Sequence, residues 1–156
     1  MDEQDERRIS RLPKQLLNCL ENEDKKGAFI DEVKFCYEDV LVYRGISEVD
    51  KISKNDFLGN VETNQLKRKK PRYKINDYRN HGVSVNENLQ ELKKALKFPN
   101  SNIHGVACGK MRCCYGPADF KQGKHHHNWY LFDGANASVA NEFRVLDIVS
   151  GKEEHK

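Results

Sequence analysis

The stretch at residues 40–46, Val-Leu-Val-Tyr-Arg-Gly-Ile, constrains the fold of this chain most strongly. Five of its seven residues are apolar or aromatic, and their β-branched content predicts a buried strand. Arg44 therefore needs a partner, because a buried guanidinium is costly unless it is paired. Gly45 would let the backbone approach whatever Arg44 holds. The structural alternative is an arginine that reaches solvent from the strand end.

The chain has 156 residues, which corresponds to one domain that can bury a core without disulfides or a metal. No apolar run approaches the roughly eighteen residues that span a bilayer, and the first residues lack the apolar core of a secretion signal. We therefore expect a cytoplasmic protein with no membrane partner. Five irregularly spaced cysteines predict free thiols.

Charge is distributed unevenly along the chain. Residues 1–66 carry 10 Lys/Arg against 15 Asp/Glu (net −5), whereas residues 67–156 carry 17 against 9 (net +8). The second half could face an anionic ligand or polymer. Its basic run, which predicts an exposed loop and a possible nucleic-acid contact, consists of Lys67, Arg68, Lys69, Lys70, Arg72 and Lys74. Tyr73 and Tyr78 could stack on unpaired bases beside it.

The spacing of apolar residues predicts short helices and short strands in mixed order. The predicted helices are residues 7–23, residues 89–96 with Asn86 or Asn88 as N-cap, and either a short helix or an approach to the central strand at residues 28–36. The predicted strands are residues 40–46, 80–85, 103–109, 129–132 and 141–149, and residues 121–128 are predicted to form a polar loop.

These elements predict an α+β fold, because the strands are not separated by regularly spaced helices. We expect a compact single domain with a helical cap at residues 1–27. An α+β core of short, mostly antiparallel strands would follow at residues 28–150, with a frayed tail at residues 151–156.

Three segments then occur in a suggestive order: Tyr-Arg-Gly at residues 43–45, Gly-Val-Ser-Val at 82–85 and Asn-Glu-Phe-Arg at 141–144. This order resembles the arginine, serine and glutamate arrangement of the ADP-ribosyltransferase superfamily. The resemblance implies a split-sheet fold, NAD as cofactor, and transfer of ADP-ribose or hydrolysis of NAD.

The resemblance also implies roles for individual residues. Arg44, with Gly45 beside it, would hold a phosphate of NAD, and a guanidinium suits phosphate oxygens. Ser84 would position the nicotinamide-ribose side. Glu142 would bind a ribose hydroxyl and stabilise the oxocarbenium-like transition state. An aromatic residue is expected to stack on the nicotinamide, and Tyr73 or Tyr78 would serve.

The chain departs from the family pattern at two places. The second motif reads Ser84-Val85-Asn86 where many relatives have Ser-Thr-Ser, and Ala140 stands where relatives that modify proteins often carry Gln or Glu. The second departure favours a nucleic-acid or small-molecule acceptor over a protein. A toxin or defence effector, with an antitoxin-type protein partner, is one biological setting for such an enzyme.

Two other readings of the sequence stay open. His127, just ahead of a predicted strand, could act in catalysis, although a surface imidazole is its structural alternative. His104, Cys108, Cys113 and Cys114, near the histidine run at residues 125–127, could bind zinc, although no Cys-x-x-Cys pair is present. The alternative function is therefore a non-enzymatic nucleic-acid-binding domain, with or without a stabilising zinc ion.

Overall fold

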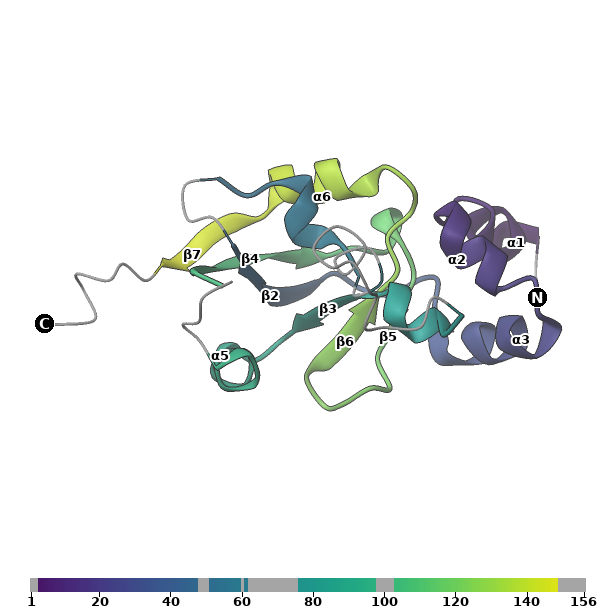
Figure 1. Cartoon of the computed structure of the whole chain (residues 1–156), viewed down its shortest axis with the longest axis horizontal. Helices are drawn as coiled ribbons and strands as arrows, with labels where there is room; N and C mark the ends of the chain where they lie inside the picture. The colour runs from purple at the N-terminus through teal and green to yellow at the C-terminus, as the bar shows by residue number, and fades with distance from the viewer. Residues whose placement is uncertain (1–2, 48–50, 60, 62–75, 98–102, 149–156) are drawn as a thin grey trace, which may run out of the picture.

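The computed structural model describes residues 3–47, 51–59, 61, 76–97 and 103–148. Its seven strands form one sheet in the order β1-β5-β6-β3-β2-β4-β7, and every neighbouring pair is antiparallel. Three helices gather at one end of this sheet, and β7 lies toward the opposite end (Figure 1). The predicted α+β class and antiparallel pairing are confirmed, and the strands belong to a single continuous sheet.

The elements are short. The described α-helices are α1 (Glu3–Ile9), α2 (Lys14–Cys19), α3 (Glu23–Glu32), α5 (Leu89–Leu96) and α6 (Ala135–Glu142). The 3-10 helices are η1 (Lys54–Phe57), η2 (Tyr78–His81) and η3 (Cys113–Tyr115). The strands are β1 (Val33–Lys34), β2 (Val40–Ile46), β3 (Val83–Asn86), β4 (Gly105–Met111), β5 (Ala118–Asp119), β6 (His126–Trp129) and β7 (Arg144–Ile148).

The single helix predicted for residues 7–23 is wrong, because three helices occupy the first 32 residues. Pro13 is the N-cap of α2 and separates it from α1. Proline disfavours helical backbone in the residue before it, so one helix cannot run through this point. The side chain of Asn22 then starts α3 by accepting from the backbone N–H of Lys25 at 3.1 Å. The helical segment therefore continues past residue 27 to Glu32.

Other predictions match closely. β2 covers the predicted residues 40–46, and the Asn88 side chain caps α5 by accepting from the Glu91 N–H at 3.0 Å. Three predictions are wrong. The strand predicted at residues 129–132 is β6, which covers residues 126–129 and ends at Trp129. The histidine run enters strand β6 instead of lying in a loop, and Glu142 ends helix α6 instead of lying in a strand.

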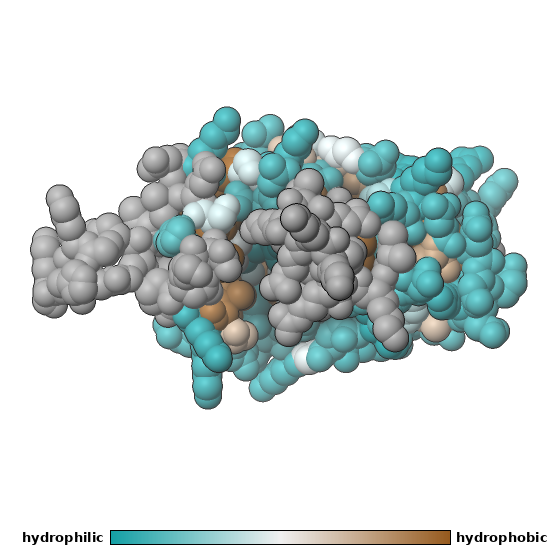
Figure 2. All heavy atoms as spheres, viewed as in Figure 1, coloured by the Kyte–Doolittle hydropathy of each residue, from teal (hydrophilic) through white to brown (hydrophobic). Residues whose placement is uncertain are grey.

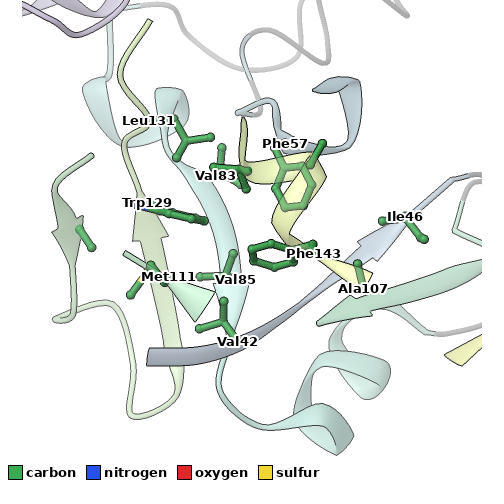
Figure 3. Close-up of a cluster of buried hydrophobic side chains, with 13 residues drawn as sticks. Val42, Ile46, Phe57, Val83, Val85, Ala107, Met111, Trp129, Leu131 and Phe143 are labelled. Atoms are coloured by element: carbon green, nitrogen blue, oxygen red, sulfur yellow. The ribbon is translucent and has the colours of Figure 1, made fainter. Parts of the chain in front are cut away.

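One face of the sheet carries the main hydrophobic core, and we call it the core face. Val42, Val83, Val85 and Trp129 point from the sheet into this core, where the rings of Phe57 and Phe143 pack 4.8 Å apart between centroids (Figure 3). These two rings come from η1 and from the end of α6, so α6 and η1 cover the core face. This packing buries the core face of the sheet beneath α6 and η1.

The opposite face is partly covered by α5, and we call it the α5 face. A Cβ on Gly45 would lie 2.7 Å from Leu96 Cδ1 and 2.9 Å from Ile103 Cγ2. Gly45 therefore makes room for α5 and Ile103, and not for a ligand of Arg44, whose side chain belongs to the other face. Successive residues of a strand point to opposite faces, so Tyr43 shares the α5 face with Gly45.

A second hydrophobic cluster joins the three N-terminal helices to the sheet. Phe29 of α3 is fully buried and packs edge-on against Tyr78 and Tyr130, with ring centroids 5.6 and 5.0 Å apart. Hydrophilic residues cover most of the outer surface at this end of the molecule (Figure 2). Within the described ranges, no helix has the length and apolar character that crossing a membrane requires.

Candidate active site

Ser84 and His126 meet on the α5 face. Ser84 lies on β3 and His126 on the neighbouring strand β6, and the register pairs Asn86 with His126 and Ser84 with Asn128. Directly opposed residues of antiparallel strands share a face, so Ser84 and His126 are diagonal neighbours. Ser84 Oγ lies 2.5 Å from His126 Nε2. Both side chains are half-buried.

The environment favours the neutral form of His126. Its pKa is lowered, first because burial disfavours the charged imidazolium and second because of the charge on neighbouring His127. Asp119 acts in the opposite direction. In the neutral tautomer whose Nδ1 carries the proton, the Nε2 lone pair would accept from the Ser84 hydroxyl. In that tautomer the pair would have the polarity of a nucleophile and its base.

Asp119 influences this pair without touching it. Its fully buried carboxylate accepts from the Lys121 backbone N–H at 2.8 Å and from Gln122 Nε2 at 2.7 Å. The register pairs Asp119 with Asn128, on the same face as His126. The negative charge of Asp119 therefore reaches His126 through space, where it stabilises an imidazolium formed transiently during proton transfer.

Arg44 connects three pieces of backbone. Its guanidinium donates to the carbonyl oxygens of Asp56 (2.6 Å), Leu58 (3.0 Å) and Ser84 (2.6 Å). Burial lowers the pKa of Arg44 to about 10, against the opposing effect of Asp56, so the group stays charged at neutral pH. Arg44 thus ties η1 and the following residues to β3, and each of its three guanidinium nitrogens donates to a backbone carbonyl oxygen.

Glu142 lies in another part of the fold. Its Oε1 is 3.5 Å from Arg112 Nη1, and Arg112 Nε is 3.5 Å from Asp39 Oδ2. Glu142 ends α6 one residue before β7, and β7 is two strand spacings from β2, which carries Arg44, and three from β3, which carries Ser84, or about 10 and 14 Å. The structure therefore brings Arg44 and Ser84 together, as the motif order implies, and leaves Glu142 apart from them.

His127 and Tyr78 are buried among core residues. His127 is 2% exposed, points to the core face, and has Nε2 2.5 Å from Glu87 Oε2. Tyr78 packs against Phe29 in the second cluster and is 5% exposed. Sequence reasoning chose His127 and missed His126. A strand predicted to begin at His126 would have placed His126 and His127 on opposite faces. Only one of the two could then share the face of Ser84.

The remaining sequence candidates do not form a described site. Tyr73 and the basic run at residues 67–74 lie outside the described residues. The zinc candidates do not come together: across the part of the chain that the structure describes, no group of three or more His, Cys, Asp or Glu side chains could hold a metal ion. His104 Nδ1 instead lies 2.8 Å from the carbonyl oxygen of Ser47, and all five cysteines are free thiols.

A cavity of about 360 Å³ lies beside the Arg44 contacts, between α2 and the sheet. Leu58 and Val83 line it. Arg44 binds the carbonyl oxygen of Leu58 and that of Ser84, the residue after Val83. Tyr130, whose side chain is fully buried, also lines the cavity. The volume and the mostly apolar walls suit a small organic molecule.

Comparison of this chain with protein-family models, with curated proteins and with solved structures finds no match.

Proposed function

We propose that this protein is an acyl-transfer enzyme in which Ser84 is the nucleophile and His126 its general base. The observation that carries the proposal is the contact of 2.5 Å between Ser84 Oγ and His126 Nε2, in an environment that favours the neutral imidazole. A serine hydroxyl is a weak nucleophile at its ordinary pKa, and an adjacent neutral imidazole activates it. An ester is the simplest substrate class that suits such a pair.

The proposed reaction uses the tautomer of His126 in which Nε2 accepts the hydrogen bond from Ser84 Oγ. Ser84 Oγ attacks the ester carbonyl carbon while its proton passes to His126 Nε2. The carbon–oxygen bond to the leaving alcohol then breaks, and the imidazolium returns its proton to that alcohol. Water then attacks the acyl carbon and gives its proton to His126 Nε2. The bond from that carbon to Ser84 Oγ breaks, and His126 returns the proton to Ser84. Asp119 stabilises the imidazolium through space.

Positioning of the nucleophile comes from the core. Val83 and Val85, on either side of Ser84, are buried in the core face and hold β3 in place. The guanidinium of Arg44 holds the Ser84 carbonyl oxygen at 2.6 Å. Arg44 is therefore a positioning residue, since it contacts the backbone of the nucleophile and not the substrate.

Labelling with a fluorophosphonate tests the proposal. The Ser84 oxygen would attack phosphorus, fluoride would leave, and the hydroxyl proton would pass to His126. We expect mass spectrometry to find one phosphonyl group on the peptide that contains Ser84, and none after Ser84→Ala. Substitution of a positioned base reduces rates by roughly 100-fold or more, so His126→Gln should slow labelling by about that factor.

His125→Gln is the matched control, because it removes the adjacent imidazole, which pairs with Glu91 and not with Ser84. Its labelling rate should equal that of the unmodified protein. Circular dichroism and urea unfolding establish that each variant is folded before rates are compared. A folded protein whose Ser84 stays unlabelled, or labelling that His125→Gln and His126→Gln reduce equally, would refute the proposal.

ADP-ribosyl transfer from NAD is the second candidate, and the contact between Arg44 and Ser84 favours it, because it joins the first two motifs of the resemblance. The cavity beside this contact offers space for part of the cofactor. Nicotinamide release from NAD that disappears after Glu142→Gln would support the transferase. The absence of NAD binding by calorimetry would exclude it. Whether the acceptor is a nucleic acid or a small molecule becomes a question only after NAD cleavage is observed.

A further inference from the structure

A pocket rich in positive charge lies where β4 meets β7. Lys110, Arg112 and Arg144 line it, together with one acidic residue, Glu142, and its volume is about 320 Å³. The side chains of Lys110 and Arg144 belong to exposed residues, whereas Arg112 is half-buried. With Asp39, which contacts Arg112 from outside the lining, three cations face two carboxylates, and the net positive charge that remains attracts an anionic group.

The carboxylates bind Arg112 only loosely. Glu142 and Asp39 each approach a guanidinium nitrogen to 3.5 Å, which is longer than a good charge-assisted hydrogen bond. The Arg112 Nε–H lies against Asp39 Oδ2 without meeting hydrogen-bond geometry. Arg112 could therefore exchange these long contacts for shorter bonds to a better-placed anion.

This pocket lies on the same face as the Ser84–His126 pair. The register places five residues in one row across five strands: His126, Asn86, Tyr43, Cys108 and Arg144. Directly opposed residues share a face, so the row lies on the α5 face throughout. At one strand spacing per step, β4 is about 14 Å and β7 about 19 Å from β6.

We propose that Lys110, Arg112 and Arg144 form a binding site for a phosphate group of the substrate whose ester reacts at Ser84. This inference rests on the proposed acyl-transfer function and specifies its substrate as an extended, phosphorylated ester. Arginine is suited to the task, because its planar fork binds two phosphate oxygens at once. The phosphate replaces Glu142 and Asp39 as the partner of Arg112.

Equilibrium binding of inorganic pyrophosphate tests the site without catalysis. Calorimetry should detect binding that weakens about tenfold after Arg144→Gln, since one charge-assisted bond to phosphate is lost. Arg112→Gln should weaken binding at least as much. Glu142→Gln should instead strengthen binding by about threefold, because a competing carboxylate is removed from a partly exposed site. Asp133→Asn, which removes an exposed carboxylate outside this pocket, should leave affinity unchanged.

The basic run provides the opposing control. Binding that falls in Lys67→Gln/Lys69→Gln/Lys70→Gln and not in Arg144→Gln would overturn the proposal, as would a folded protein that binds no pyrophosphate. A linked measurement uses two p-nitrophenyl esters, one of which has an acyl chain that ends in a phosphonate. We expect Arg144→Gln to reduce kcat/KM for the phosphonate ester and not for the neutral ester. Equal effects on both esters would contradict a shared substrate.

The two proposals fail separately. Ser84 labelling without pyrophosphate binding would refute the phosphate site and still support the acyl-transfer function. Pyrophosphate binding that responds to Arg144→Gln, in a protein whose Ser84 is not labelled, would retire the enzyme and with it the assignment of this phosphate to a Ser84 substrate.

Discussion

Replacing Arg44 by methionine should destabilise the protein severely. Methionine retains much of the length of the side chain but removes three hydrogen bonds, to the carbonyl oxygens of Asp56, Leu58 and Ser84. Hydrogen bonds from a charged donor contribute about 1.5–3 kcal/mol each, and those of one group do not add fully. We therefore expect a loss of about 4 kcal/mol in the free energy of unfolding, against a typical total of roughly 5–15 kcal/mol.

Urea unfolding followed by circular dichroism measures this loss. With a slope of about 2 kcal/mol per molar urea, the midpoint should fall by about 2 M. Arg44→Lys keeps the charge, but the compact ammonium of lysine cannot reach the three carbonyl oxygens that the planar guanidinium binds. The urea midpoint of this variant should therefore fall by an intermediate amount.

Arg7→Met is the control, because Arg7 is exposed on α1, and a surface substitution usually changes stability by about 0.5 kcal/mol or less. A loss below about 1 kcal/mol for Arg44→Met would refute the argument that Arg44 holds η1 and β3 together.

Three further predictions follow from burial and contact. Gly45→Ala should cost about 1–3 kcal/mol in urea unfolding, because its new Cβ would overlap Leu96 and Ile103 and displace α5. Ellman's reagent should modify the exposed thiols of Cys36 and Cys114 in the folded protein. It should modify Cys19 and Cys108 only as the protein unfolds, because both thiols are buried and burial raises their pKa values. The rate of Ser84 labelling should stay constant down to pH 6.5, the ordinary pKa of histidine, and fall only below it, because burial lowers the pKa of His126 and only its neutral form accepts the proton.

Much of the fold could be predicted from local signals. The β-branched run at residues 40–46 indicated β2, and the N-cap Asn88 followed by apolar residues at helical spacing indicated α5. These signals succeed because each lies within one element and does not depend on distant partners. The same logic indicated that Arg44 needs a partner, since the cost of burying a guanidinium is a property of the residue.

The identity of that partner could not be predicted. Arg44 finds its acceptors on backbone carbonyls of Asp56 and Leu58, 12 and 14 residues along the chain, and of Ser84, 40 residues along it. Any residue type presents a carbonyl, so the sequence carries no mark of these contacts. The prediction that Glu142 lies in a strand was wrong for a different reason. Alternation of apolar and polar residues over a short segment does not distinguish a strand from the last turn of a helix followed by a strand.

The contact between Arg44 and Ser84 explains why stability and the proposed chemistry are coupled in this fold. Arg44 extends from the core face, whereas the Ser84 hydroxyl extends from the α5 face, so the two groups meet only through the Ser84 carbonyl. A change at Arg44 can therefore alter the distance from Ser84 Oγ to His126 without touching either side chain. Arg44→Lys separates these effects, because a variant that remains folded but labels Ser84 slowly has lost positioning alone. Slow labelling that follows the unfolded fraction at each urea concentration would instead assign Arg44 to stability only.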